Sequence, residues 1–180
     1  MNATYFQGDI GIRPFPIEDA PAAFAAVEET REDLQAWLPA AGVVRQEADV
    51  AGWIATHPEA WEQGESYQFA IVNSAGEFLG GCGLTAARHH HRFANAYYWV
   101  RQSAQGRGVA ASALQLLARF GLEGVGLERI EIVVAIGNAP SLGVARKSGA
   151  VEEGVLRRRI LIDGVAHDAV MFSMIRADLG

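Results

Sequence analysis

Two glycines near the middle of the chain mark the strongest candidate for a ligand site. The segment Gln105-Gly106-Arg107-Gly108-Val109-Ala110 follows an apolar, strand-like run at 97–100 and precedes a run with helical apolar spacing. Without Cβ atoms, Gly106 and Gly108 let the backbone turn tightly and bring its N–H groups close to a ligand. A helix that begins there adds free N–H groups and the positive end of its dipole. The segment therefore predicts an anion site, most naturally for a pyrophosphate.

Three other interpretations compete for these glycines. A P-loop needs the pattern GxxxxGK[ST], which the sequence lacks. Residues 106–111 match the dinucleotide pattern GxGxxA, but a polar spacer at 101–104 separates them from the preceding strand-like run. The next apolar run also ends in Ile136-Gly137 rather than in an acidic ribose ligand. An ordinary glycine-containing turn before a helix is the remaining alternative.

Histidine and cysteine usage argues against a metal site. His89-His90-His91 could titrate near neutral pH or bind a metal, but adjacent residues on a loop rarely converge on one ion. Cys82 is the single cysteine, which excludes an intrachain disulfide and a thiolate cluster. We expect a solvated connection at these histidines and no metal, with one histidine as an outside candidate for a general base.

Length and composition indicate one globular domain spanning residues 1–180, because half of the residues are hydrophobic. The net charge of −6 and the scattered basic residues argue against nucleic acid as a partner, whereas an amine or a basic peptide suits this charge. No apolar segment approaches the roughly 18 residues of a membrane span, and the amino terminus lacks a secretion-signal pattern. We expect a cytoplasmic protein without a membrane partner.

The hydrophobic pattern predicts a mixed α/β or α+β domain with a largely antiparallel sheet and at least one parallel strand–helix–strand step. Thr30 followed by Asp33 is typical of a helix-capping box. Asn138-Ala139-Pro140-Ser141 makes a helix-starting turn, with Ser141 as N-cap and Asn138 bonding the backbone. The expected strands are 9–13, 67–72, 77–84, 94–100, 129–135 and two more joined by Asp163-Gly164. The expected helices are 17–29, 30–38, 48–61 with a break at His57-Pro58, one that follows the glycines, and 141–148. The helix after the glycines has its apolar positions at Val109, Ala113, Leu116, Leu117 and Phe120.

The chain resembles the GNAT acetyltransferases, and within them the branch of the RimJ and RimL protein N-terminal acetyltransferases. The glycine loop fits the acetyl-coenzyme A motif [QR]xxGx[GA] with Gln105, Gly108 and Ala110. The tripeptide Tyr98-Trp99-Val100 stands where that branch has YW and an aliphatic residue.

A third match lies after the next strand and is similar to the segment NxxS…A.K.GF of that branch. Asn138–Ser141 and Ala145–Gly149 fit it, with Ala150 in place of the usual aromatic residue. The resemblance spans nearly the whole chain and is strongest at 94–153. It implies a GNAT-like three-layer fold, with a mixed, mostly antiparallel central sheet flanked by helices.

The resemblance implies that acetyl-coenzyme A (acetyl-CoA) and an acceptor amine meet in one ternary complex, in which the amine attacks the thioester directly. Backbone groups near Trp99 and Val100 would bind the pantetheine arm and place an N–H near the thioester oxygen. The coenzyme-binding residues implied are Trp99, Val100, Arg101, Gln105, Gly106, Arg107, Gly108, Val109, Ala110, Asn138 and Lys147.

The resemblance also implies catalytic roles for Ser141 and Asn138, with the Ser141 hydroxyl donating to the departing thiolate. Family members often carry a carboxylate base where this chain has Asn95. An α-amine with a pKa near 8 is roughly a tenth neutral at pH 7, whereas lysine, near 10.4, is neutral well under one time in a thousand. The missing carboxylate therefore favours an α-amine acceptor. The resemblance also implies Trp37 and Asn95 as candidate acceptor contacts.

The function predicted is an acetyl-CoA-dependent N-acetyltransferase acting on a protein N-terminal α-amine of the ribosomal-protein type. An acetyltransferase for a small amine, such as a polyamine, amino acid or antibiotic, would use the same coenzyme site. A non-catalytic acetyl-CoA-binding or sensing module is the alternative from another class. Dimers are common among similar proteins, so a homodimer is a further expectation, by analogy alone.

Overall fold

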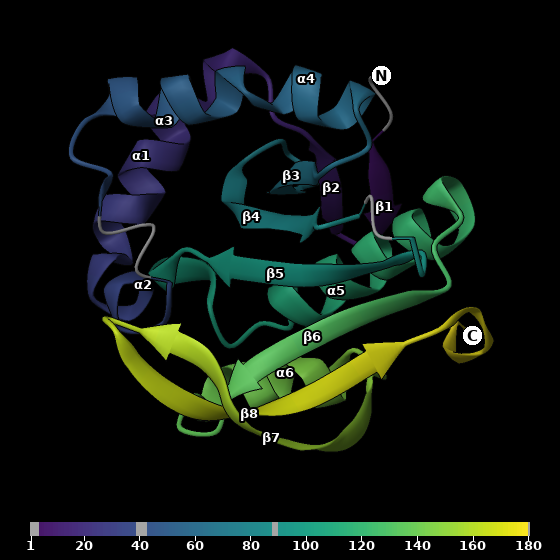
Figure 1. Cartoon of the computed structure of the whole chain (residues 1–180). Helices are drawn as coiled ribbons and strands as arrows, with labels where there is room; N and C mark the ends of the chain where they lie inside the picture. The colour runs from purple at the N-terminus through teal and green to yellow at the C-terminus, as the bar shows by residue number, and fades with distance from the viewer. Residues whose placement is uncertain (1–3, 39–42, 88–89, 180) are drawn as a thin grey trace.

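An eight-stranded sheet in the order β1-β2-β3-β4-β5-β6-β8-β7 runs through the molecule (Figure 1). The computed structural model describes residues 4–38, 43–87 and 90–179. Every neighbouring pair is antiparallel except β5 and β6, which are parallel and joined through a helix. The strands are β1 (Tyr5–Gln7), β2 (Ile10–Pro14), β3 (Tyr67–Asn73), β4 (Phe78–Thr85), β5 (Phe93–Val100), β6 (Arg129–Ala135), β7 (Val151–Ile162) and β8 (Val165–Met174).

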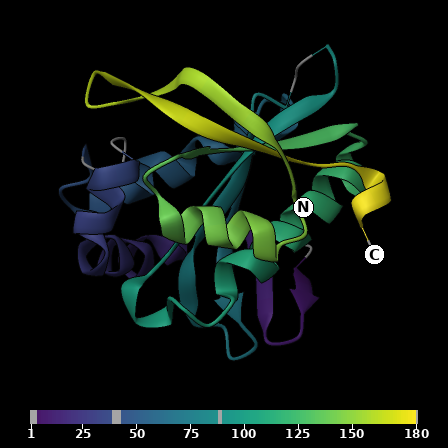
Figure 2. The same cartoon turned by 90° about the horizontal axis from the view of Figure 1, so that it is seen from below.

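Helices cover both faces of the sheet and give the molecule three layers. Helices α5 and α6 lie side by side on one face, and α1 and α3 pack on the other (Figures 1 and 2). None of the helices in the described parts of the chain is long and apolar enough to cross a membrane. The helices are α1 (Ala20–Glu29), α2 (Arg31–Trp37), α3 (Glu47–Ala55), α4 (His57–Glu62), α5 (Val109–Arg119) and α6 (Ala139–Lys147).

The alternation of side chains along the strands builds one core on each face. In β3, Phe69 and Ile71 belong to the core under α5, whereas Ala70 and Val72 belong to the core under α1 and α3. This follows from the two-residue period of a strand, which sends successive side chains to opposite faces. The apolar stripe predicted for α5 is buried at Val109, Ala113, Leu116 and Leu117.

The predicted fold class and the parallel strand–helix–strand step are confirmed. Each predicted strand and helix forms, β6 over the predicted residues 129–135 and the others with shifted ends. Strand β1 was not predicted, and the helix expected from Ile17 begins as a 3₁₀ turn before α1 starts at Ala20. The hairpin expected around residues 73–76 joins β3 to β4, and the break at His57 separates α3 from α4.

Two predicted helix caps are wrong in part, although Thr30 stands at the N-cap position of α2 and Asn138 bonds the backbone as expected. Thr30 makes no capping bond within α2; its Oγ1 instead accepts the N–H of Gln102 at 3.0 Å. Asn138, not Ser141, is the N-cap of α6, and its Oδ1 accepts the N–H of Ser141 at 3.1 Å. Helix α6 can begin earlier than expected because Pro140 lies in its first turn, where a missing N–H costs nothing.

Candidate active site

The parallel strands β5 and β6 separate toward their carboxyl ends and open the sheet. They pair at only three positions, Phe93 with Arg129, Ala94 with Ile130 and Asn95 with Glu131. Along its other edge β6 stays paired with β8 up to Ala135, so it follows β8 away from β5 (Figure 1). Beyond Asn95, the edge of β5 therefore has no strand partner on this side.

The register of β5 decides which backbone groups face the opening. The N–H of Arg101 donates to the carbonyl of Leu79 at 2.8 Å, which continues the antiparallel ladder with β4. Because alternate residues of such a ladder face the partner strand, Trp99 faces β4, whereas Tyr98 and Val100 turn their N–H and C=O groups toward the opening. Of the backbone groups near Trp99 and Val100 that the resemblance points to, those of Tyr98 and Val100 therefore face the opening.

A cavity of about 570 Å³ occupies this opening and extends from the glycine loop to α2 and the end of β7. It brings together most of the predicted site residues, from four separate parts of the sequence. Those that line it are Trp37, Trp99, Val100, Gln105, Gly106, Gly108, Val109, Ala110, Asn138, Ser141 and Lys147.

The glycine loop has the geometry of an anion cradle. Gly106 and Gly108 adopt φ values of 75° and 82°, which favour glycine, and a Cβ on either residue would meet nothing within 4 Å. Helix α5 begins directly afterwards at Val109, and no side chain caps its first turn. The loop thus offers open space, backbone N–H groups and the positive end of a helix dipole, which together suit a pyrophosphate.

Beside the opening, Tyr98 and Ser141 form a hydroxyl pair. The Tyr98 hydroxyl lies 2.9 Å from Ser141 Oγ and 3.1 Å from the Ser141 carbonyl oxygen. Asn138 fixes the first turn of α6 by accepting the Ser141 N–H, so the serine hydroxyl has a defined position. Burial raises the pKa of Tyr98 to about 12, and the hydrogen bond with Ser141 only partly offsets that rise. Tyr98 therefore stays a protonated donor at neutral pH.

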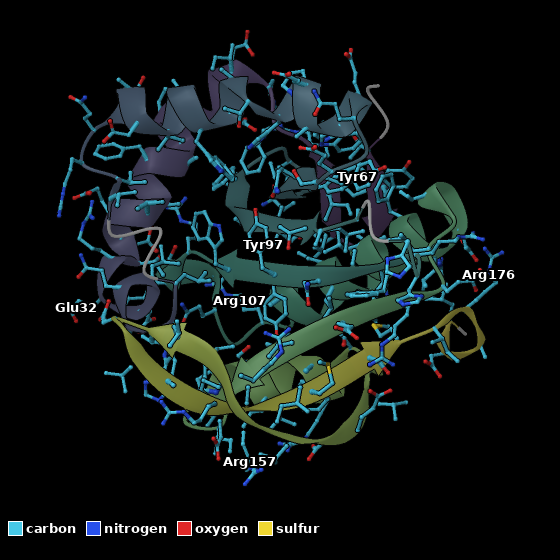
Figure 3. All side chains as sticks on the ribbon, in the orientation of Figure 1. Glu32, Tyr67, Tyr97, Arg107, Arg157 and Arg176 are labelled. Atoms are coloured by element: carbon cyan, nitrogen blue, oxygen red, sulfur yellow. The ribbon has the colours of Figure 1, made fainter. Side chains whose placement is uncertain are left out.

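Apolar side chains line the opposite end of the cavity. Trp37, at the end of α2, reaches across to the turn after β6, where a Cβ on Gly137 would lie 3.4 Å from the indole ring. Tyr97 also lines this cavity from the middle of β5 (Figure 3), but its hydroxyl donates to Gln68, away from Ser141. The other apolar residues at this end are Leu34, Leu38, Ile160 and Ile162.

Three predicted site residues do not line the cavity: Arg101, Arg107 and Asn95. The guanidinium of Arg101 pairs with the Glu29 carboxylate, its Nε lying 2.9 Å from Glu29 Oε2. Arg107 is exposed in the loop between β5 and α5 (Figure 3). Asn95 stands where β5 and β6 still pair, and its buried Oδ1 has no hydrogen-bond partner within the described structure.

The histidine run is described only in part, because His89 lies outside the described residues. The rings of His90 and His91 lie 3.8 Å apart, centre to centre. Over residues 4–38, 43–87 and 90–179, no group of three or more histidine, cysteine, aspartate or glutamate side chains could hold a metal ion.

Four residues that line the cavity were not predicted as site residues: Tyr98, Asp33 and the β7 residues Ile160 and Ile162. Tyr98 belonged to a recognised motif, but its pairing with Ser141 bridges 43 positions of sequence. Asp33 and the two isoleucines reach the cavity only through the packing of α2 and the β7–β8 hairpin. No local pattern in the sequence marks them.

Comparisons with known proteins agree with this architecture. A family model described as an acetyltransferase (GNAT) domain matches residues 9–151. YdaF of Bacillus subtilis, provisionally named a ribosomal N-acetyltransferase, is 25% identical over 94% of this chain and 92% of its own. The solved RimL, a ribosomal L7/L12 alpha-N-protein acetyltransferase in complex with coenzyme A, superposes with a TM-score of 0.88 at 21% identity, covering 99% of this chain and 100% of that one.

Mycobacterium smegmatis RimJ, solved in complex with a CoA-disulfide, is 28% identical with a TM-score of 0.83, covering 96% of this chain and 84% of that one. The family match itself covers well over half of the chain. The splayed strands, the glycine loop and the family match lead to one conclusion. The chain belongs to the GNAT acetyltransferase family, and it is an N-acetyltransferase.

Proposed function

We propose that this enzyme transfers an acetyl group from acetyl-CoA to the α-amine of a protein N-terminus, of the ribosomal-protein type. The observation that carries the proposal is the continuous cavity from the glycine loop, past the Tyr98–Ser141 pair, to the apolar wall at Trp37. One end suits a pyrophosphate and the other suits the side chain of a peptide's first residues. The names of YdaF and RimL support an acceptor of this kind.

Acetyl-CoA would lie along the open edge of β5. Its phosphates would contact the N–H groups of the glycine loop and of the first turn of α5, with Lys147 as a cationic neighbour. The thioester oxygen would accept a hydrogen bond from the N–H of Tyr98 or Val100 as negative charge develops on it. These fixed donors need no reorganisation during the reaction.

In the chemical step the amine nitrogen attacks the thioester carbonyl carbon, a C–N bond forms, and the C–S bond breaks. The Ser141 hydroxyl would donate to the departing sulfur. We assign the Tyr98 hydroxyl, 2.9 Å from Ser141 Oγ, as a donor to that oxygen in this step, which would keep the serine proton directed at the leaving group. A thiol with a pKa of roughly 8.5 leaves readily near neutrality, so a positioned hydrogen bond suffices.

The nitrogen loses its proton to water. Among the described residues that line the cavity, Asp33 is the only carboxylate, and it accepts a hydrogen bond from Gln105 Nε2 at 3.3 Å. A cavity without a carboxylate beside Ser141 suits an amine that is partly neutral already. An α-amine with a pKa near 8 meets that condition far better than a lysine near 10.4.

The test is acetyl-CoA-dependent thiol release across peptides that differ in their first residue, alongside spermidine, free amino acids and aminoglycosides. We expect turnover with one class of peptide N-terminus and none with the same peptides blocked by an N-terminal formyl group. Turnover confined to the small amines would contradict the acceptor, and acetyl-CoA binding without turnover on any acceptor would contradict catalysis.

A further inference from the structure

The loop that leads from β5 to the glycines is held by the opposite helical layer. Residues Gln102–Ala104 of this loop form a 3₁₀ turn whose own N-cap residue, Arg101, makes no side-chain capping bond. The N–H groups at the start of this turn would therefore lack acceptors. The acceptors come from the junction of α1 and α2, more than seventy positions earlier in the sequence.

Glu29 and Thr30 supply these acceptors. Glu29 Oε1 accepts the N–H of Ser103, and Oε2 accepts Nε of Arg101 at 2.9 Å. The buried Thr30 contributes Oγ1, which accepts the N–H of Gln102 at 3.0 Å. The side chains of Glu29 and Thr30 thus accept hydrogen bonds from the backbone N–H groups of Gln102 and Ser103 and from the Arg101 guanidinium.

A third contact lies one turn further along α2. Asp33 Oδ2 accepts Gln105 Nε2 at 3.3 Å, and the same amide nitrogen lies 3.2 Å from the carbonyl oxygen of Val100. Gln105 is the residue immediately before Gly106, so the chain is tethered up to the point where the glycine loop begins. The clamp is made of Glu29, Thr30 and Asp33.

We propose that Glu29 is a positioning residue for the coenzyme: it holds Arg101 and the Ser103 amide so that Gly106–Gly108 and the start of α5 stay in place for the phosphates. This inference rests on the proposed function. It also gives Arg101 a role as the partner of Glu29, in place of a phosphate ligand. The hydrogen bond from Arg101, followed by that from Ser103, lowers the pKa of Glu29 to about 2, so the carboxylate is charged throughout the working pH range.

The chain offers a matched control. Glu153 is likewise a carboxylate bound to an arginine, Arg129, and to a second donor, Ser173, and its pKa is also lowered to about 2. Glu153 lies on β7 and does not line the cavity. Glu29→Ala and Glu153→Ala therefore remove equivalent carboxylates, one inside and one outside the clamp.

The first measurement is amide hydrogen exchange in the coenzyme-free protein. We expect Glu29→Ala to speed exchange at Ser103, Thr30→Val to speed it at Gln102, and Glu153→Ala to change neither. Unchanged exchange at Ser103 and Gln102 would overturn the clamp itself. Thr30→Val preserves side-chain shape, so it keeps the test decisive if Glu29→Ala fails to fold.

The second measurement is calorimetric binding of acetyl-CoA. We expect Glu29→Ala to raise the Kd and the KM for acetyl-CoA about tenfold at an unchanged kcat. The loop loses its hydrogen bonds to the charged Glu29 carboxylate, so the glycines are no longer held in place for the phosphates. Glu29→Ala and Arg101→Gln break the same ion pair. The double variant should therefore change the Kd for acetyl-CoA by less than the two single effects combined. Unchanged binding of acetyl-CoA by Glu29→Ala would overturn the inference. Tighter binding would overturn it too, by showing that Glu29 keeps Arg101 away from the phosphates.

The two proposals fail in different ways. A wild-type protein that binds no acetyl-CoA would overturn the proposed function. Wild-type binding together with an unaltered affinity in Glu29→Ala would overturn only the positioning role of Glu29.

Discussion

The Tyr98 hydroxyl lies 2.9 Å from Ser141 Oγ and joins the open edge of β5 to the first turn of α6. The contact places a hydroxyl that can donate to a leaving thiolate next to a phenol that remains protonated. The proposed chemistry depends most on this contact, because Tyr98 would contribute both a backbone N–H at the opening and a hydroxyl beside Ser141.

Ser141→Ala tests the serine as the proton donor. We expect kcat to fall about 10²-fold, which is the lower range for loss of a general acid, with the Kd for acetyl-CoA unchanged. Stopped-flow thiol release and calorimetry would separate the two effects. Ser148→Ala is the control, since this serine is the C-cap of α6, at the opposite end of the helix from Ser141, and its hydroxyl donates to the carbonyl of Ala145. An equal loss in both variants would argue for a structural role.

Tyr98→Phe tests the support given to Ser141. We expect kcat to fall about tenfold through loss of one hydrogen bond, whereas Tyr97→Phe, which removes the bond to Gln68, leaves kcat unchanged.

The pH profile of the rate gives a second check on Tyr98. Because burial raises the pKa of Tyr98 to about 12, its proton is present below that pH and lost only above it. As the pH increases, the rate should therefore rise while the acceptor amine, with a pKa near 8, loses its proton, and then stay level to about pH 10. A fall in rate between pH 8 and 10 in the wild type that is absent from Tyr98→Phe would contradict this role.

Gly108→Ala tests the anion cradle. A residue with a Cβ at φ 82° is strained by about 1–2 kcal/mol, and the new methyl group enters the space assigned to the phosphates. We expect the Kd for acetyl-CoA to rise and thermal stability to fall slightly. Gly76→Ala, at φ 83° in the turn between β3 and β4, should lose similar stability without affecting binding. Equal acetyl-CoA affinity in both variants would contradict the cradle.

Much of the fold could be predicted from the sequence, because local patterns set it. Strand β6 forms over the predicted residues Arg129–Ala135, since its buried side chains alternate with more exposed ones. The glycine loop and its helix were predicted from the φ requirement of Gly108 and the apolar stripe of α5. Family recognition rested on motifs contiguous in sequence, and it is confirmed by the match to the GNAT domain.

What could not be predicted depends on contacts between layers. Thr30 fits a capping-box pattern, yet its hydroxyl oxygen accepts a hydrogen bond from the N–H of Gln102, 72 positions away. Arg101 has the charge of a phosphate ligand, and the sequence pattern did not reveal its ion pair with Glu29, the last residue of α1. The backbone N–H and C=O of Tyr98, rather than those of Trp99, face the opening, because the pairing register with β4 directs the Trp99 groups to that strand. A sequence pattern carries the residue type but not the partner that tertiary packing brings to it.

Trp37→Ala tests the acceptor end of the cavity. Removing the indole that reaches Gly137 takes away a large apolar contact, so we expect the KM for the peptide to rise about tenfold while the Kd for acetyl-CoA stays constant. Steady-state kinetics with both substrates varied would show the split. Trp53→Ala, on α3 and similarly exposed, is the control. A change in acetyl-CoA affinity alone would place Trp37 at the wrong end of the site.

The central claim is acetyl transfer to an α-amine, and the most direct measurement uses a peptide that carries one free α-amine and one lysine. The wild-type enzyme would be incubated with acetyl-CoA and this peptide, and tandem mass spectrometry would locate the acetyl group. We predict a mass increase of one acetyl group on the first residue and none on the lysine, at a rate reduced by Ser141→Ala. Acetylation of the lysine with the α-amine left free would contradict the account.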